Sequence, residues 1–175
     1  MDEKNKDIFN EFVQVYTRKI LKSLEKAGAK CLDKKELEAK CKANKGNAAA
    51  YNAALKELLR LGDVCIRRKG FGLSKLFGYY SAEVVRLSGT FGFVRPEFDG
   101  ADDVFIPGKF LLGSMPGDRV LYREIASRSG KPEGEVVDII EESDSRLTGK
   151  IISDDGILFL LPDTMSRTPI RINRR

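Results

Sequence analysis

The chain has 175 residues, of which 42% are hydrophobic and 33% charged, so it holds enough apolar material for a packed core and is not disordered throughout. It contains no histidine, which excludes Ser-His-Asp and Cys-His catalysis and any imidazole metal site. No apolar run is long enough to cross a bilayer and the N-terminus has no secretory signal, so we expect a cytoplasmic protein without a membrane partner.

Charge is spread unevenly along the chain, whose net charge is +5. The net charge is +8 over residues 1–80, −5 over residues 81–142 and +2 over residues 143–175. Because lysine and arginine release counterions when they neutralise phosphates, the basic first segment suggests a nucleic-acid partner. A solvated, lysine-rich helical surface is the alternative explanation of the same charge.

Three helices are predicted at the start of the chain. Apolar residues recur every three or four positions over residues 8–24, which predicts an amphipathic helix of about 18–20 residues ending near Gly28. A short second helix begins at Asp33, whose side chain is spaced to form a capping box with Glu36. A third helix runs from about residue 47 to residue 61 and is closed by a glycine.

A basic hairpin is predicted after the helices. Two β-like runs, 64–66 and 76–80, flank a loop in which Gly70 and Gly72 are expected to permit the turn. Three helices and a basic hairpin predict a winged helix-turn-helix domain over residues 1–80. The residues expected to contact phosphate or duplex nucleic acid are Arg67, Arg68 and Lys69 in the loop, and Lys45, Asn52 and Lys56 on one face of the third helix. For the last three, a solvated helix face is the alternative.

Residues 81–142 change to the patterning of short strands. Strand-like runs lie at 83–87, 91–96, 103–107, 119–125 and 133–140, with turn sequences between them and one possible helical turn at 109–112. Five short strands in about 60 residues predict a small closed barrel of the OB type.

The last segment, residues 143–175, reads as a partial repeat of this barrel. With an offset of 66 residues, Phe159 aligns with Phe93 and Pro162 aligns with Pro96. The segment is about half a barrel long, and a half-barrel leaves strand edges unpaired, so we expect the chain to have been cut short. The predicted fold is therefore α+β and multidomain: a winged helix-turn-helix, a five-stranded OB-fold barrel and a truncated second OB fold.

The sharpest functional signal lies on the second and third barrel strands, in Gly-Thr-Phe-Gly-Phe-Val (89–94) and Asp-Val-Phe-Ile-Pro (103–107). Side chains alternate along a strand, so Phe91 and Phe93 share one face, and Phe105 adds a third ring from the next strand. Exposed rings on adjacent strands form a platform on which unpaired bases stack, whereas the alternative is that the rings fill the barrel core. The barrel residues expected to contact RNA are Phe91, Phe93, Phe105, Arg86, Arg95, Arg128 and Lys131.

These two segments resemble the two ribonucleoprotein motifs of cold-shock domains. Together with Pro-Gly-Asp-Arg-Val-Leu (116–121), they are similar to the first cold-shock domain of the ribonuclease R family. The members of that family are bacterial 3′-to-5′ exoribonucleases of the ribonuclease II type. In that family a winged helix and two cold-shock domains precede a catalytic domain and an S1 domain, and residues 69–73 resemble the family's wing. The resemblance implies an N-terminal portion that captures single-stranded or structured RNA and guides it towards a catalytic channel.

The resemblance also implies that the family's Mg²⁺-binding aspartate cluster would lie beyond this chain. The adjacent aspartates 102–103 and 154–155 are placed as solvated turn residues, and two-metal hydrolysis needs several converging carboxylates. We therefore expect no catalytic residue, no metal site and no cofactor in this chain, which is expected to be a monomer that is not an enzyme by itself.

Two other functions remain open from the sequence. One is a winged-helix DNA-binding transcription regulator with an appended OB barrel, which predicts dimers and a preference for a duplex sequence. The other is an interaction module whose aromatic face binds protein. Competition between single-stranded RNA, single-stranded DNA and duplex for one labelled probe separates the three functions.

Overall fold

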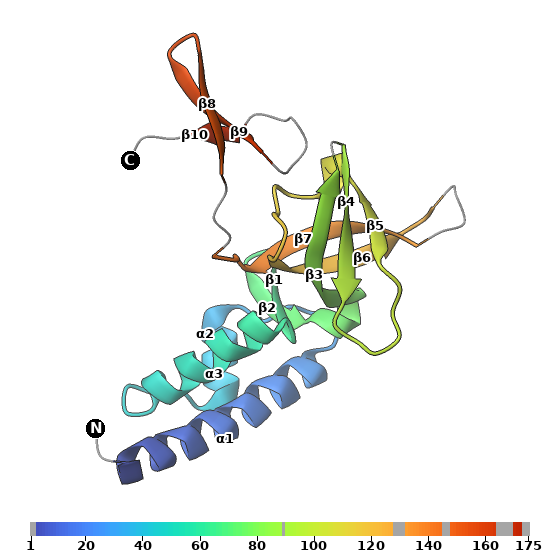
Figure 1. The fold of residues 1–175 in the computed structure, drawn as a ribbon. Helices are drawn as coiled ribbons and strands as arrows, with labels where there is room; N and C mark the ends of the chain where they lie inside the picture. The colour runs from blue at the N-terminus through green and yellow to red at the C-terminus, as the bar shows by residue number, and fades with distance from the viewer. Residues whose placement is uncertain (1–2, 89, 128–131, 145–147, 164–169, 173–175) are drawn as a thin grey trace. The chain divides into compact units, whose positions relative to one another are not determined.

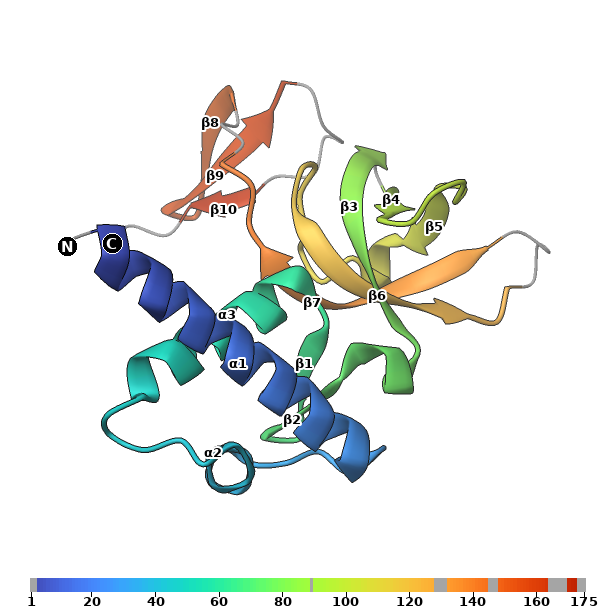
Figure 2. The same ribbon diagram turned by 90° about the horizontal axis from the view of Figure 1, so that it is seen from below.

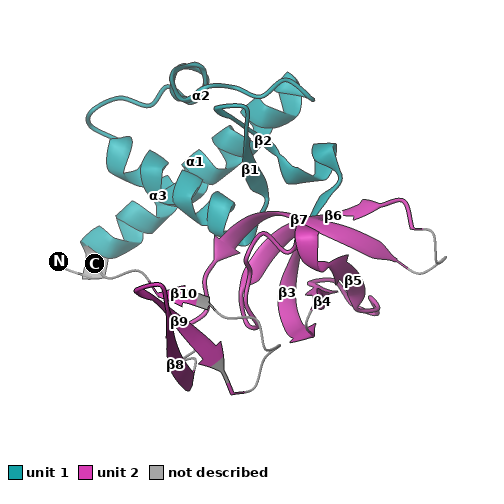
Figure 3. Ribbon diagram, turned by 90° about the horizontal axis from the view of Figure 1, so that it is seen from above, with its two compact units in different colours: residues 1–80 teal, residues 81–175 magenta. Residues whose placement is uncertain are grey.

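The computed structural model describes residues 3–88, 90–127, 132–144, 148–163 and 170–172 (Figure 1). The chain divides into two compact units, unit 1 (residues 1–80) and unit 2 (residues 81–175), which Figure 3 colours separately. Unit 1 holds three helices and a two-stranded hairpin, and unit 2 holds a closed five-stranded barrel and a three-stranded sheet. In the described part of the chain, every helix is too short or too polar to span a membrane.

The three predicted helices are present in unit 1. They are α1 (Glu3–Ala27), α2 (Lys34–Cys41) and α3 (Ala48–Leu61). The first helix begins earlier than expected because its polar N-terminal residues continue the helix before the apolar pattern starts. It ends at Gly28, whose φ of 62° is left-handed and whose N–H donates to the carbonyls of Leu24 and Glu25.

The capping box of α2 is formed by the two predicted residues. The backbone N–H of Glu36 donates to the carboxylate of Asp33 at 2.8 Å, and the N–H of Asp33 donates back to the carboxylate of Glu36 at 3.1 Å. The Asp33 N–H, and after it the Lys30 ammonium, lowers the pKa of Glu36, so the reciprocal cap stays intact at neutral pH.

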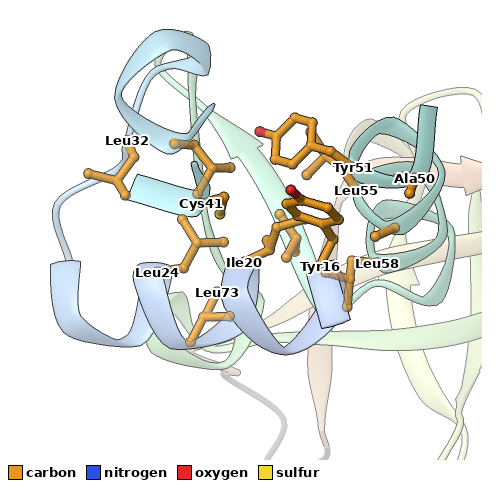
Figure 4. Packing of buried hydrophobic residues seen from close by; sticks show 13 residues of the cluster. Tyr16, Ile20, Leu24, Leu32, Cys41, Ala50, Tyr51, Leu55, Leu58 and Leu73 are labelled. Carbon is orange, nitrogen blue, oxygen red and sulfur yellow. The ribbon is translucent and has the colours of Figure 1, made fainter. Parts of the chain in front are cut away.

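The core of unit 1 is built where α1, α2 and α3 meet (Figure 4). The rings of Tyr16 on α1 and Tyr51 on α3 pack edge to face, with centroids 5.9 Å apart. Ile20 and Leu37 are fully buried beside them. Burial of this apolar surface is the main term that stabilises the unit, because each fully buried aliphatic side chain contributes about 1.5–3 kcal/mol.

The hairpin of unit 1 differs from the prediction. Strands β1 (Val64–Arg67) and β2 (Gly70–Leu73) pair directly across a two-residue turn, and a 3-10 helix, η1 (Ser74–Phe77), follows. The predicted strand at residues 76–80 is therefore wrong in its first half. The reason is tertiary: the N–H and C=O of Phe71 both bond to Leu32, at 2.8 and 2.9 Å, which fixes β2 next to the start of α2.

The barrel of unit 2 closes in the strand order β3-β4-β5-β7-β6 (Figures 1 and 2). Its strands are β3 (Tyr79–Ser88), β4 (Phe91–Pro96), β5 (Val104–Pro107), β6 (Arg119–Ile125) and β7 (Glu133–Glu141), with the short 3-10 helix η2 (Gly108–Phe110) after β5. Strands β3 and β4, β4 and β5, and β6 and β7 pair antiparallel, whereas β5 and β7 are parallel and meet at the register pair Phe105 and Glu133. The core residues are Ala82, Val84, Val94, Val104, Ile106, Val120, Tyr122 and Val136.

The three strands that follow the barrel are spaced along the sequence much as the first three barrel strands are. They are β8 (Gly149–Asp154), β9 (Ile157–Pro162) and β10 (Ile170–Ile172), in the order β10-β9-β8. Both ends of β9 lie 66 residues after the ends of β4, and β10 begins 66 residues after β5. The three-strand order also matches β5-β4-β3 of the barrel.

The buried carboxylate of Asp118 links the turn before β6 to the segment that follows β7. Asp118 is 5% exposed. It accepts hydrogen bonds from the backbone N–H groups of Met115 and Ser143, each at 2.8 Å. The carbonyl of Asp118 also accepts from the N–H of Val84 on β3. One aspartate therefore links the β6 entry turn, β3 and the residues after β7.

We predict that Asp118→Ala destabilises the barrel by roughly 2–4 kcal/mol, because it leaves two partly buried N–H groups without their carboxylate acceptor. Asp99→Ala removes an exposed loop carboxylate and should change stability by less than about 0.5 kcal/mol. The urea dependence of hydrogen exchange at barrel amides measures both variants. Equal, small losses in the two would show that the Asp118 bonds contribute little.

Candidate nucleic-acid interface

The three predicted rings form one cluster on the outer face of the barrel, called here the ring cluster (Phe91, Phe93 and Phe105). Ring centroids of Phe91 and Phe93 lie 5.8 Å apart, those of Phe91 and Phe105 5.3 Å, and those of Phe93 and Phe105 5.8 Å. All three are half-buried and belong to no part of the barrel core. The structure therefore places these rings outside the core, where Phe93 packs edge to face against the other two rings and the planes of Phe91 and Phe105 are tilted by 37°.

The glycine between two of the rings shows why they point outward. Gly92 faces the barrel interior, where an added Cβ would lie 2.6 Å from Cδ2 of Leu87 and 2.9 Å from Cδ2 of Leu111. No larger residue fits there without displacing its neighbours. Because β4 alternates, this inward glycine fixes Phe91 and Phe93 on the opposite face.

Arg86 lies against the ring cluster because β3 contains a bulge. The register shifts between Val84 and Arg86, so that Val84 pairs with Val94 while Arg86 pairs with Phe93. Strict alternation from the buried Val84 would have turned Arg86 inward, and the bulge returns it to the outer face. Its guanidinium carbon lies 4.1 Å from the centroid of Phe93, a cation-π contact.

The other arginines of the barrel are paired with carboxylates or lie outside the described residues. Arg95 Nε donates to Asp103 at 2.9 Å, and this hydrogen bond raises the pKa of Arg95. Arg123 donates to Glu135 at 2.7 Å, and Arg119 pairs with the carboxylates of Glu97 and Glu141. Arg128 and Lys131 lie outside the residues that the structure describes. Within the described part of the barrel, Arg86 is the cation that lies against the ring cluster.

The predicted hairpin cations lie at the β1–β2 turn, in an unusual backbone. Arg68 and Lys69 are exposed and have φ values of 50° and 67°, the left-handed region that glycine and asparagine adopt most readily. Arg67 is half-buried, with its guanidinium carbon 4.8 Å from the centroid of Phe77. Two basic residues therefore occupy turn positions whose left-handed backbone is energetically unfavourable for any residue with a Cβ.

The prediction that Gly70 and Gly72 form this turn is wrong. Both glycines lie within β2, and each allows a close approach instead. A Cβ on Gly70 would lie 2.9 Å from Cβ of Cys31, and one on Gly72 would lie 2.5 Å from the ring of Phe77. The glycines are therefore explained by packing against the rest of unit 1.

The helix residues predicted to contact duplex nucleic acid are not all on the helix. Asn52 and Lys56 are exposed and one turn apart on α3, whereas Lys45 lies in the turn before it. The side chain of Asn47 accepts from the N–H of Asn44 at 2.7 Å, and this turn delays the start of the helix until Ala48. The prediction that Lys45 shares their helix face is therefore wrong, although Lys45 is itself exposed.

No metal-binding cluster of three or more cysteine, aspartate or glutamate side chains occurs among the residues described. Asp103 is ion-paired with Arg95, and Asp155 forms the β8–β9 turn with a φ of 45°. Cys41 and Cys65 are buried thiols whose pKa values are raised by burial, which makes them poor nucleophiles at neutral pH.

Comparison with known proteins places the ring cluster inside a recognised domain. Residues 87–139 match the family described as the Ribonuclease B OB domain. The chain is similar to ribonuclease R of Acidithiobacillus ferrooxidans, with 27% identity over 146 residues, which cover 82% of this chain and 33% of that protein. It is also similar to ribonuclease R of Vibrio parahaemolyticus serotype O3:K6 (strain RIMD 2210633), with 28% identity over 148 residues, which cover 82% of this chain and 18% of that protein. The chain thus spans a third or less of these curated relatives.

We predict that Arg68→Asn combined with Lys69→Gly raises the stability of unit 1 by about 1 kcal/mol, because it keeps the two-residue turn and relieves its left-handed backbone. Thermal unfolding measures the gain. The matched control is Arg68→Ala with Lys69→Ala, which removes the same charges but keeps a Cβ at both positions. An equal gain in the two variants would attribute the effect to charge and contradict the argument from backbone strain.

Proposed function

We propose that the chain is the RNA-binding N-terminal portion of a ribonuclease R-like 3′-to-5′ exoribonuclease. The observation that carries the proposal is the ring cluster, which lies on the outer face of a barrel whose residues 87–139 match the Ribonuclease B OB domain. Similarity to two ribonuclease R proteins over 82% of the chain supports the same function.

In this proposal each part of the chain takes the place of a domain of that family. Unit 1 is a winged helix-turn-helix domain whose wing is the β1–β2 hairpin, and the barrel is a first cold-shock domain. The spacing and strand order of β8, β9 and β10 support a partial second OB fold. Ile157 and Arg171 stand there at the positions of Phe91 and Phe105, so this second fold is not expected to stack bases.

The ring cluster is proposed to hold unpaired bases by stacking, with each stacked base worth about 1–3 kcal/mol. Segment 81–142 is net acidic by five charges, and three of its described arginines are paired with carboxylates. Stacking therefore supplies affinity on the barrel, with Arg86 available to one phosphate. The electrostatic attraction is assigned to basic unit 1, whose exposed Arg68 and Lys69 lie at the wing turn.

We further propose that this chain holds RNA without cutting it. The Mg²⁺ chemistry of a ribonuclease R-like enzyme needs converging carboxylates. The described residues do not fit such an ion, because they contain no acidic cluster of three. In a complete enzyme, the role of this portion is capture of RNA and delivery of its strand to a catalytic domain.

Phe93→Ala should weaken binding of a fluorescein-labelled single-stranded oligoribonucleotide by about 1–3 kcal/mol at every salt concentration, because it removes a stacking surface and no charge. Fluorescence anisotropy measures the affinity, and the RNA should stay intact in Mg²⁺ throughout. The control is Phe98→Ala, which removes a 55% exposed ring from the loop after β4. Equal affinity of the Phe93 variant and the unchanged protein would remove the ring cluster from the proposal.

Replacing Arg67, Arg68 and Lys69 together by glutamine should flatten the salt dependence of binding. Each phosphate contact with a single strand contributes about 0.7 to the slope of log K against log salt, so three contacts contribute about 2. Glutamine at Lys22, Lys35 and Lys40, three exposed lysines of α1 and α2, provides a charge-matched control.

An unchanged slope in the wing variant would overturn this assignment of the charge contacts. Unlabelled single-stranded RNA, single-stranded DNA and duplex DNA serve as competitors in the same assay. Displacement by one duplex DNA sequence far better than by single-stranded RNA would favour a winged-helix transcription regulator instead.

A further inference from the structure

Exposed apolar side chains run along the N-terminal half of α1. Ile8, Phe12 and Val15 are 44%, 52% and 44% exposed. They are spaced by four and three residues, so they lie next to one another on one face of the helix. The residues of α1 that enter the core, among them Tyr16 and Ile20 (Figure 4), lie about a third of a turn further around the helix axis. The helix therefore has a second apolar face, which the core of unit 1 leaves exposed.

This face continues into a row of lysines. Lys19, Lys22 and Lys26 follow Val15 at intervals of four, three and four residues, so they extend the same face toward the end of the helix. All three are exposed, and Nζ of Lys19 lies 4.8 Å from the ring centroid of Tyr16. Residues 16–27 hold four cations and one carboxylate, a net charge of +3. The whole face is called here the α1 stripe (Ile8, Phe12, Val15, Lys19, Lys22 and Lys26).

The chemistry of the α1 stripe favours an acidic polypeptide as its occupant. Ile8 and Val15 have no ring on which a base could stack, so RNA would leave their apolar surface in water. A second copy of the chain would bring another basic surface, because residues 1–80 carry a net charge of +8. A polypeptide with apolar side chains against the first half and carboxylates against the second half would bury the former and neutralise the latter.

We propose that the α1 stripe is a docking site for an acidic amphipathic helix of another protein. Helices pack side by side along apolar stripes of this spacing. In an antiparallel alignment the two helix dipoles oppose each other, and the N-terminal half of the partner helix lies against the lysines. Carboxylates in that half also stabilise the partner helix itself. The partner is therefore expected to carry its acidic residues first and its apolar residues second. This surface is separate from the ring cluster and adds protein binding to the proposed RNA binding.

The test uses the full chain and a fluorescein-labelled synthetic peptide that mirrors the α1 stripe. Three glutamates are followed by three leucines at intervals of four, three, four, three and four residues, with alanine and glutamine elsewhere. Fluorescence anisotropy should show saturable binding. Phe12→Ala should weaken binding by about tenfold or more, because it removes the largest apolar side chain of the stripe. Alanine is a stronger helix former than phenylalanine, so α1 should stay folded.

A matched pair of isoleucines controls for the loss of any exposed apolar side chain from unit 1. Ile8→Ala should weaken peptide binding roughly threefold to tenfold. Ile66→Ala removes a 57% exposed isoleucine from β1 and should leave the affinity unchanged. Equal losses in the two variants would show that the peptide binds apolar surface without preference for the stripe, which would contradict the proposal.

The lysines are tested through the salt dependence of peptide binding. Lys22→Gln combined with Lys26→Gln should weaken binding and flatten its dependence on salt. Lys35→Gln combined with Lys40→Gln removes the same charge from exposed positions of α2 and should change the dependence less. A peptide with lysine in place of the three glutamates should not bind. Equal affinity of the acidic and basic peptides would contradict the charge argument.

The remaining outcomes concern other occupants and the proposed function. Absence of peptide binding, or binding that Phe12→Ala leaves unchanged, would overturn the proposal. A dimer in sedimentation velocity that Phe12→Ala dissociates would assign the stripe to a second copy instead. Pelleting with phosphatidylcholine–phosphatidylglycerol vesicles that Phe12→Ala abolishes would assign it to a membrane surface. Displacement of the peptide by single-stranded RNA would assign it to RNA. Single-stranded RNA should bind the Phe12 variant and the unchanged protein equally, so failure of this inference leaves the proposed function standing.

Discussion

A closed five-stranded barrel has room inside for little more than its own inward side chains, and this limit determines where the ring cluster lies. Gly92 occupies a position where even one methyl group would collide with Leu87 and Leu111. The flanking rings, Phe91 and Phe93, therefore stand on the opposite face, next to Phe105. The apolar surface that gives the barrel its candidate function is thus a product of the same packing that gives the barrel its stability.

Charge is divided between the two units in a complementary way. The barrel uses arginines such as Arg119 and Arg123 to neutralise its own carboxylates, which leaves Arg86 beside the rings in the described part of the barrel. Unit 1 instead exposes Arg68 and Lys69 at a tight turn despite an unfavourable backbone. Base stacking is therefore assigned to the barrel and phosphate attraction to unit 1. Because RNA binding is proposed to need both interactions, the two units are treated as one binding portion.

The sequence predicted those features that depend on local chemistry. The capping box of Asp33 and the end of α1 at Gly28 follow from residues close together in the chain, and strand alternation was enough to place Phe91 and Phe93. It did not predict the β1–β2 turn, because arginine and lysine carry no turn signal there. Glycine was interpreted as a turn residue where it allows close packing. The ion pairs of Arg119, with partners 22 residues away on either side, depend on the closed fold.

The parallel contact between β5 and β7 has a mechanical consequence. Among the described residues these strands meet at the register pair Phe105 and Glu133, and the N–H of Phe105 also donates to the carbonyl of Pro132. Parallel strands also pair slightly less stably per residue than antiparallel ones. A ligand bound on Phe105 would contact one side of this junction and, because it binds only the folded barrel, would oppose local separation of β5 from β7.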